Sequence, residues 1–330
     1  MDRLLTIYHE NIPDFLREFA GTPLLRRLRS VGMNCGCEYT SFPRFQNLQP
    51  YSRFDHSLGV ALILWHFTGD MAQSLAGLFH DAATPVFSHV VDFLHGDHLR
   101  QESTEEGTAD RIAGDGECCR LLEKYGLSLA QVADYHIYPL ADNPSPALSA
   151  DRLEYTLGNL YNYGFASLDT IRDFYTDLTI GTDEREEPEL VFRTPALASA
   201  FAAAALKNAY VYVADEDRFA MESLALLLRK AMERDILTEW DLWKTEPEVI
   251  RALQSDPACS AEWVRYQSYS RLLRRDSRPG EDGWLRIDAK KRWIDPLAIG
   301  CGRVSRWDVE VQRQIDAFCA LDFNCWLSAE

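Results

Sequence analysis

The chain has 330 residues, 46% of them hydrophobic, which is enough for one large domain with a buried core or for one domain with an appendage. Its formal net charge of -17 repels the backbone of a long nucleic acid and an anionic lipid surface, so neither is an expected partner. A small anionic substrate is still compatible, because a metal ion and a few arginines reverse the field inside a cleft.

Helical periodicity dominates the chain. The segment from Ser57 to Thr68 is apolar nearly all round, which predicts a central buried helix. Asp70 is placed to cap the next helix, in MAQSLAGLFHD. Further helical patterns follow in chain order: Glu102 to Ile112, Glu117 to Tyr125, Ser128 to Tyr135, Pro146 to Asn159, Leu168 to Leu178, Pro195 to Ala214, Glu216 to Arg234, Pro247 to Leu253 and Ser305 to Leu321.

Two segments break this pattern. The segment from Leu178 to Arg193 has β-branched ends around an acidic turn, which predicts a small β-hairpin. The segment from Trp284 to Ile294 alternates as a strand does, and no repeat or low-complexity linker is present. We therefore expect an all-α fold with a small hairpin, divided into a domain at 1–240 and an additional C-terminal helical part at 241–330 packed on it.

The N-terminus, MDRLLTIYHENIPDF, lacks the apolar core of a signal peptide, and no stretch reaches the ~18 apolar residues of a membrane span. Eight cysteines without a secretory signal predict reduced thiols and a cytoplasmic location. The pair Cys35 and Cys37 has the spacing of half a zinc site, but Cys118 and Cys119 do not supply a matching second pair.

Histidines and carboxylates recur at helix ends. His56 begins the central helix, the pair His80 and Asp81 ends the following one, and Asp151 lies in a third helical segment. Imidazole and carboxylate groups are good ligands for divalent first-row metals, and ligands from three helices leave positions for water and substrate. Spacing alone also allows a plainer reading, because a His-Asp dipeptide is common and a lone histidine is often a cap or a core residue.

Four segments strengthen the metal hypothesis. TPLLRRLRSVG, RFDHSLGVAL, AGLFHDAATPVFSHVVDF and SADRLEY lie between Thr22 and Asn159 in the order of motifs in the HD superfamily of metal-dependent phosphohydrolases. The chain resembles the deoxynucleoside triphosphate triphosphohydrolase-like subgroup, with the matched core at 22–160, and WIDPLAIG is a weaker match. The resemblance implies an HD-domain helical fold and one divalent transition metal (Mn, Fe, Ni, Co or Zn) or Mg per chain. Its implied ligands are His56, His80, Asp81 and Asp151.

The resemblance also implies roles for other residues. In such enzymes the metal binds the phosphate and activates a water, because a cation lowers the water pKa and offsets phosphate charge. Arg53 and Arg152 correspond to residues that face substrate phosphates, and a planar guanidinium suits that contact. Tyr155 corresponds to a residue that touches the sugar or phosphate, and His89 or Glu102 is the candidate for proton transfer. From the residues alone, surface pairing or core packing explains each of these side chains as well.

Several positions depart from the subgroup pattern. Thr84 stands where a histidine is usual, and a threonine does not titrate near neutral pH. Gln101 and Glu102 stand where a His-Glu pair is usual, and we hypothesise that His98 substitutes from one helical turn earlier. Thr84 and His98 are therefore candidate substrate-facing residues. Two residues that read the sugar in relatives are replaced by Met33 and Asn159.

These observations favour a phosphohydrolase acting on a nucleotide or another small phosphorylated substrate. A non-hydrolytic nucleotide-sensing module is the alternative that Thr84 and Gln101 favour. A two-iron oxygenase is the third reading, and it needs further ligands such as His98, Glu102 or His136. Relatives of this type often form homo-oligomers, but no interface signal is present in the sequence.

Overall fold

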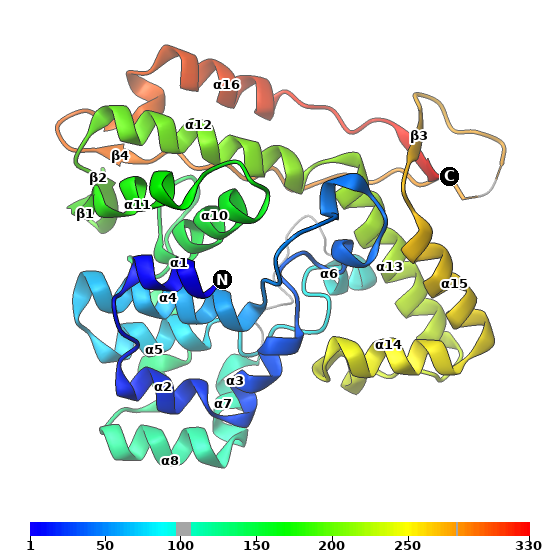
Figure 1. The fold of residues 1–330 in the computed structure, drawn as a ribbon, viewed down its shortest axis with the longest axis horizontal. Helices are drawn as coiled ribbons and strands as arrows, with labels where there is room; N and C mark the ends of the chain where they lie inside the picture. The colour runs from blue at the N-terminus through cyan, green and yellow to red at the C-terminus, as the bar shows by residue number, and fades with distance from the viewer. Residues whose placement is uncertain (97–106, 282) are drawn as a thin grey trace.

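The computed structural model describes residues 1–96, 107–281 and 283–330. Helices dominate it, so a mostly helical fold is confirmed, although two small sheets add more strand structure than one hairpin (Figure 1). His98, Gln101 and Glu102 lie outside the described residues, as does the first part of the helix expected from Glu102.

The expected central helix is α4 (Arg53–Thr68). It begins where Ser52 and Asp55 form a capping box, and it ends at Gly69, whose φ of +62° suits a residue without a side chain. Asp70 caps α5 (Met71–Phe79) by accepting hydrogen bonds from the backbone of Ala72 and Gln73. α4 packs against α5 and against α10 (Ala150–Asn162), so three helices that carry the candidate ligands are neighbours.

The other helices lie on several sides of these three, except that the helices between residues 215 and 268 form a separate group at the right of the view (Figure 1). In the first half of the chain they are α1 (Asp2–Tyr8), α2 (Asp14–Ala20), α3 (Pro23–Arg27), α6 (Val90–His95), α7 (Thr108–Gly114), α8 (Gly116–Tyr125) and α9 (Leu129–Val132). In the second half they are α11 (Leu168–Thr176), α12 (Pro195–Tyr212), α13 (Asp215–Glu233), α14 (Glu246–Ser255), α15 (Pro257–Ser268) and α16 (Val309–Cys319).

Five of these helices were not expected from the sequence. α1, α2, α3 and α6 have seven residues or fewer, which is too short for a helical repeat to stand out. α15 has 12 residues but buries only Cys259, Trp263 and Tyr266. The helix expected from Pro146 begins later, because the Ser149 hydroxyl accepts a hydrogen bond from the backbone of Arg152 and caps α10.

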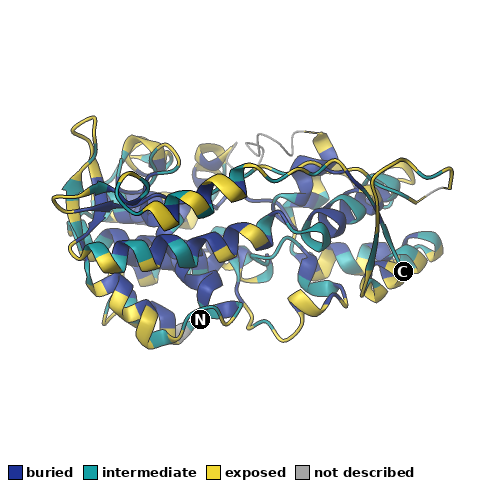
Figure 2. Ribbon diagram, turned by 90° about the horizontal axis from the view of Figure 1, so that it is seen from above, coloured by how far each residue is buried: buried dark blue, intermediate teal, exposed yellow. Residues whose placement is uncertain are grey.

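Two hydrophobic cores hold the molecule together. The larger one joins α1, α4, α5, α10, α12 and α16, and the second joins α6, α13, α14 and α15. Buried residues follow the inner faces of the helices and exposed ones the outer faces (Figure 2). α14 and α15 belong to the second core, whereas α16 packs on α12. The expected boundary near residue 240 stays a prediction.

The expected hairpin is present as β1 (Leu178–Thr182) and β2 (Pro188–Phe192), paired antiparallel. It extends into a four-stranded sheet, because β4 (Leu297–Ala298) pairs parallel with β2 and β5 (Gly302–Arg303) pairs antiparallel with β4. A second sheet joins β3 (Leu272–Arg275) and β6 (Trp326–Ala329).

The prediction of a strand from Trp284 to Ile294 was wrong. Within the described part of this segment only Leu285 forms a β-bridge, to Leu327. The rest runs irregularly, because tertiary contacts occupy it instead: the buried guanidinium of Arg218 donates to the carbonyl of Ile287.

Within the described ranges, no single helix is both long and apolar enough to cross a bilayer. α12 and α13 meet that criterion of length and composition only as a pair, with a bend of 43° between them.

Candidate metal centre

Three helix ends bring the candidate ligands together. His56 lies in the first turn of α4, which the Ser52 capping box fixes in place. His80 is the residue at which α5 ends, and Asp151 lies in the first turn of α10. Residues 95 positions apart in the chain therefore meet at one point.

The ligand atoms of His56, His80 and Asp151 form a compact trio. The Nε2 atom of His56 lies 3.0 Å from Oδ1 of Asp151 and 3.1 Å from Nε2 of His80, and the third separation, between His80 and Asp151, is 3.6 Å. Ligand atoms about 2.1 Å from a metal and at right angles to each other would lie about 3 Å apart. In the described part of the chain, this trio is the group of histidine, cysteine and acidic side chains that could hold a metal ion.

The hydrogen bonds on the far sides of both rings fix which nitrogen faces the trio. The Nδ1 atom of His80 lies 2.7 Å from the carbonyl oxygen of Gly77, which only accepts, so Nδ1 carries the hydrogen. The Nδ1 atom of His56 lies 2.6 Å from a carboxylate oxygen of Glu154 and is a donor for the same reason. In the neutral rings both Nε2 lone pairs then point toward the Asp151 carboxylate. Three electron-pair donors that face one another need a cation between them, so the residues fit a divalent metal.

Without a metal, the charges around the trio favour a proton in this place. Burial by itself disfavours protonated His56, but hydrogen bonds to Asp151 and Glu154 outweigh it and raise the pKa of His56 to about 10. Burial also acts against ionised Asp151, yet the hydrogen bond with His56 lowers the pKa of Asp151 to about 2. The trio thus favours one positive charge at its centre.

Asp81 lies beside the trio. Its Oδ2 atom is 3.6 Å from Nε2 of His80 and 3.9 Å from Nε2 of His56. Arg53 donates to the same oxygen at 3.0 Å, and the Thr84 hydroxyl donates to the other oxygen at 2.7 Å. Burial opposes ionisation, but the charge of Arg53 keeps the pKa of Asp81 well below its ordinary range. Asp81 therefore offers a fourth anionic oxygen at the edge of the site.

Glu154 was not expected from the sequence. It is buried beneath His56, and its carboxylate also accepts hydrogen bonds from Tyr51 at 2.5 Å and from Tyr8 at 3.3 Å. A Cβ atom at Gly59 of α4 would lie 2.6 Å from this side chain, so a glycine is needed at the crossing. The sequence held one signal, because Glu154 lies three residues after Asp151 and hence on the same helical face.

A cavity of about 360 Å³ opens beside the trio. Arg53, His89, Arg152 and Tyr155 all line it, as expected for residues that meet a substrate. Thr84 does not line it: the side chain is buried on Asp81, so the geometry favours a positioning role over the expected substrate contact.

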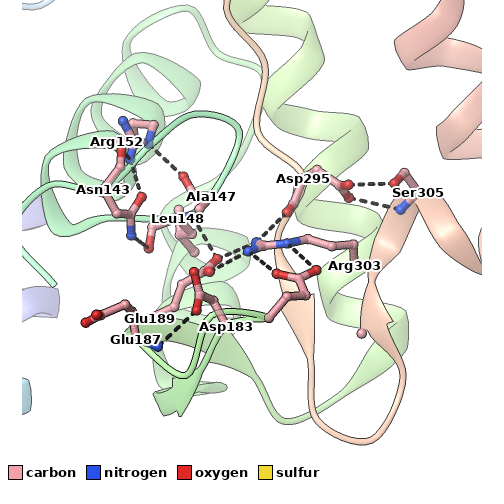
Figure 3. A network of polar contacts seen from close by, with 12 residues as sticks. Asn143, Ala147, Leu148, Arg152, Asp183, Glu187, Glu189, Asp295, Arg303 and Ser305 are labelled. Atoms are coloured by element: carbon pink, nitrogen blue, oxygen red, sulfur yellow. Dashed lines mark hydrogen bonds and ion pairs between the residues drawn. The ribbon is translucent and has the colours of Figure 1, made fainter. Parts of the chain in front are cut away.

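The two arginines already form hydrogen bonds and ion pairs with other residues of the protein. Arg53 donates from Nε to the Ser88 hydroxyl at 2.9 Å, in addition to its bond with Asp81. Arg152 donates to the carbonyl of Ala147 at 2.7 Å and contacts Asn143 (Figure 3). It also pairs with Asp142 at 3.0 Å. Arg152 therefore also fixes the chain that leads into α10.

Two cavity residues have well-defined protonation. The Nδ1 atom of His89 lies 2.9 Å from a carboxylate oxygen of Asp92 and must donate to it, which leaves the lone pair on Nε2. Burial lowers the pKa of His89, so the ring is neutral near pH 7. Burial, assisted by the charge of Asp151, raises the pKa of Tyr155 to about 12, so its phenol stays a hydrogen-bond donor.

No family model matches the chain. Over 205 residues the chain is 28% identical to a protein of Bacillus subtilis (strain 168) named "Uncharacterized protein YdhJ", a match that covers 62% of this chain and 61% of that protein. Over 127 residues it is 26% identical to "Metal-dependent phosphohydrolase cns2" of Cordyceps militaris, covering 38% of this chain and 36% of that protein. The chain thus spans less than two thirds of the length of these two relatives.

Other cavity residues come from parts of the chain that the sequence did not connect with the site. Tyr212 lines the cavity from the end of α12. Lys290, Lys291 and Arg292 line it from the irregular segment before β4. A signal existed for the second group, because three consecutive basic residues are unusual in a chain with a net charge of -17.

Proposed function

We propose that the chain is a metal-dependent phosphohydrolase that acts on a nucleotide or another small phosphorylated molecule. The observation that carries this proposal is the convergence of two imidazole lone pairs and the Asp151 carboxylate at the wall of a cavity that also holds basic side chains. The similarity to a protein named as a metal-dependent phosphohydrolase supports the same reaction class. The proposed cofactor is one divalent metal per chain, Mn, Fe, Ni, Co, Zn or Mg.

The proposed ligands are His56 and His80 through Nε2, and Asp151 and Asp81 through carboxylate oxygens. When bound, the metal supplies Lewis-acid chemistry that makes water a stronger nucleophile and offsets charge on the phosphate. Glu154 holds the His56 ring in the orientation that this ligation needs. Arg53 keeps Asp81 ionised and brings a positive charge to the same wall.

The remaining cavity residues act on the substrate and on the proton. His89 presents a neutral Nε2 lone pair, so we assign it the role of proton acceptor from the attacking water. Tyr155 and Arg152 provide donors to the substrate. The role expected for Glu102 in proton transfer stays a prediction. The role expected for His98 in substrate binding also stays a prediction.

The test is a panel assay. Purified protein, loaded in turn with each metal, is incubated with nucleoside mono-, di- and triphosphates and simple phosphate esters, and released phosphate and pyrophosphate are measured. The proposal predicts release by wild type and none by Asp151→Asn, with Arg286→Gln on the exposed surface as a matched control. A protein that holds its metal and turns over nothing in the panel would contradict the proposal.

A nucleotide-sensing role without turnover is the second candidate. Thr84, at the position where the subgroup usually has a histidine, is fixed on Asp81 and provides no titrating group to the cavity. Measurable nucleotide affinity without hydrolysis would select this role. Two irons per chain, with oxygen consumption, would select the oxygenase instead.

A further inference from the structure

The segment of residues 288–293 is held in place from both sides. Before it, the buried guanidinium of Arg218 donates to the carbonyl of Ile287. Toward the C-terminus, the Lys291 ammonium donates to the carbonyls of Cys319 and Leu321 at 2.5 and 2.6 Å. Beyond the segment, the backbone of Asp295 donates to Pro146 at 2.9 Å, and the Asp295 carboxylate binds Ser305 (Figure 3). A basic segment from the C-terminal part of the chain is thus fixed along the cavity that holds the candidate metal site.

The arginines deeper in the cavity wall are already neutralised. Each binds a carboxylate of the protein, so little of its charge is left for a ligand. The pairs are Arg53 with Asp81 at 3.0 Å, Arg152 with Asp142 at 3.0 Å, and Arg218 with Asp215.

Arg292 differs from these three. It is half-buried and lines the cavity, and it makes no hydrogen bond or ion pair with any residue that the structure describes. Its charge acts on His89, Tyr155 and Tyr212, which line the same cavity, so it lies among the residues next to the metal trio. A partly buried guanidinium without a counter-ion is unfavourable, and an anion in the cavity removes that penalty.

We propose that Arg292 binds a phosphate group of the substrate, beside the metal trio. This inference rests on the proposed function and adds to it a substrate contact that comes from outside the motif-bearing region. A guanidinium offers two parallel N–H donors that match two phosphate oxygens. Lys291 cannot take this role, because its ammonium already donates hydrogen bonds to the two carbonyls that anchor the segment.

The test uses the full chain loaded with manganese and measures binding of inorganic phosphate and of pyrophosphate by calorimetry. Arg292→Gln is expected to weaken binding about 10- to 100-fold, as for the loss of hydrogen bonds to a charged group. Arg292→Lys keeps the charge but not the paired donors. Its phosphate affinity is expected to lie between those of wild type and Arg292→Gln. Arg286→Gln removes the same charge from an exposed position just before the segment and outside the cavity lining, and is expected to bind as wild type.

The results separate the alternatives. Phosphate binding that depends on Arg292, with unchanged manganese affinity, supports the subsite, and tighter binding of pyrophosphate than of phosphate points to a polyphosphate substrate. Three results would overturn the subsite. They are a phosphate affinity of Arg292→Gln equal to that of wild type, no anion binding by wild type, and a loss of manganese binding together with phosphate binding in Arg292→Gln. Arg292-dependent anion binding in a protein that hydrolyses nothing supports the subsite and contradicts the hydrolase. Hydrolysis by the chain with an unchanged KM in Arg292→Gln supports the hydrolase and contradicts the subsite. Equal melting temperatures of the variants exclude misfolding.

Discussion

The Nδ1 atom of His56 lies 2.6 Å from the Oε2 atom of Glu154, on the side of the ring opposite the candidate metal site. Both side chains are buried, and Tyr51 donates to the same carboxylate oxygen. A carboxylate in this position orients a metal-binding imidazole and raises its basicity. The contact therefore couples the packing of α4 on α10 to the affinity of the site.

Glu154→Gln should weaken metal binding about 10- to 100-fold, because the neutral amide neither fixes the ring nor supports its basicity as a carboxylate does. The measurement is the manganese affinity by calorimetry. Tyr8→Phe removes only the longer hydrogen bond to the other oxygen of Glu154 and should change the affinity much less. Wild-type affinity in Glu154→Gln would show that the pairing is merely structural.

Metal removal should lower stability in a way that depends on Asp151. Wild type in metal at 100 times its dissociation constant should gain about 2.7 kcal/mol over chelated protein, by mass action alone. Asp151→Asn should show no such gain and no stoichiometric metal by elemental analysis. Equal stabilisation of both proteins would mean that the metal binds elsewhere.

Metal binding should strengthen as pH rises. The pKa of His56 in the metal-free protein is about 10, so at neutral pH the metal must displace a proton from this ring. Affinity should therefore increase between about pH 6 and about pH 9, with one proton released per metal, which calorimetry in buffers of different ionisation enthalpy detects. The stability that protonated His56 gives the metal-free protein has the opposite sign: it is full below the ordinary histidine pKa and is lost as pH rises through about 10. A pH-independent affinity would contradict this prediction.

The buried pair of Glu189 and Arg303 should stabilise the entry into α10. Arg303 binds both oxygens of Glu189, at 2.6 and 2.7 Å, and Glu189 accepts from the backbone of Leu148, next to the cap residue Ser149 (Figure 3). Glu189→Gln leaves a buried guanidinium only partly paired and should cost about 3–5 kcal/mol in the free energy of unfolding, measured with urea. Glu184→Gln, at a carboxylate 38% exposed on the same arginine, should cost far less. Equal losses would mean that burial of the pair does not matter.

The sequence by itself indicated the elements whose signals are local. The all-round apolar character of α4, the cap at Asp70 and the β-branched ends of the hairpin each depend on neighbouring residues, so they could be recognised before the fold was known. The choice of His56, His80 and Asp151 came from motif order, and the structure brings these three together.

Only the tertiary structure decided the surroundings of that trio. Glu154 under His56 and Arg292 at the cavity each depend on which distant segments pack together, and no periodicity encodes that. The error at Trp284 to Ile294 has the same origin, because alternation makes a strand only where a neighbouring strand is present to accept its hydrogen bonds. Local patterns fix elements and their polar ends, whereas long-range packing fixes which side chains share one buried space.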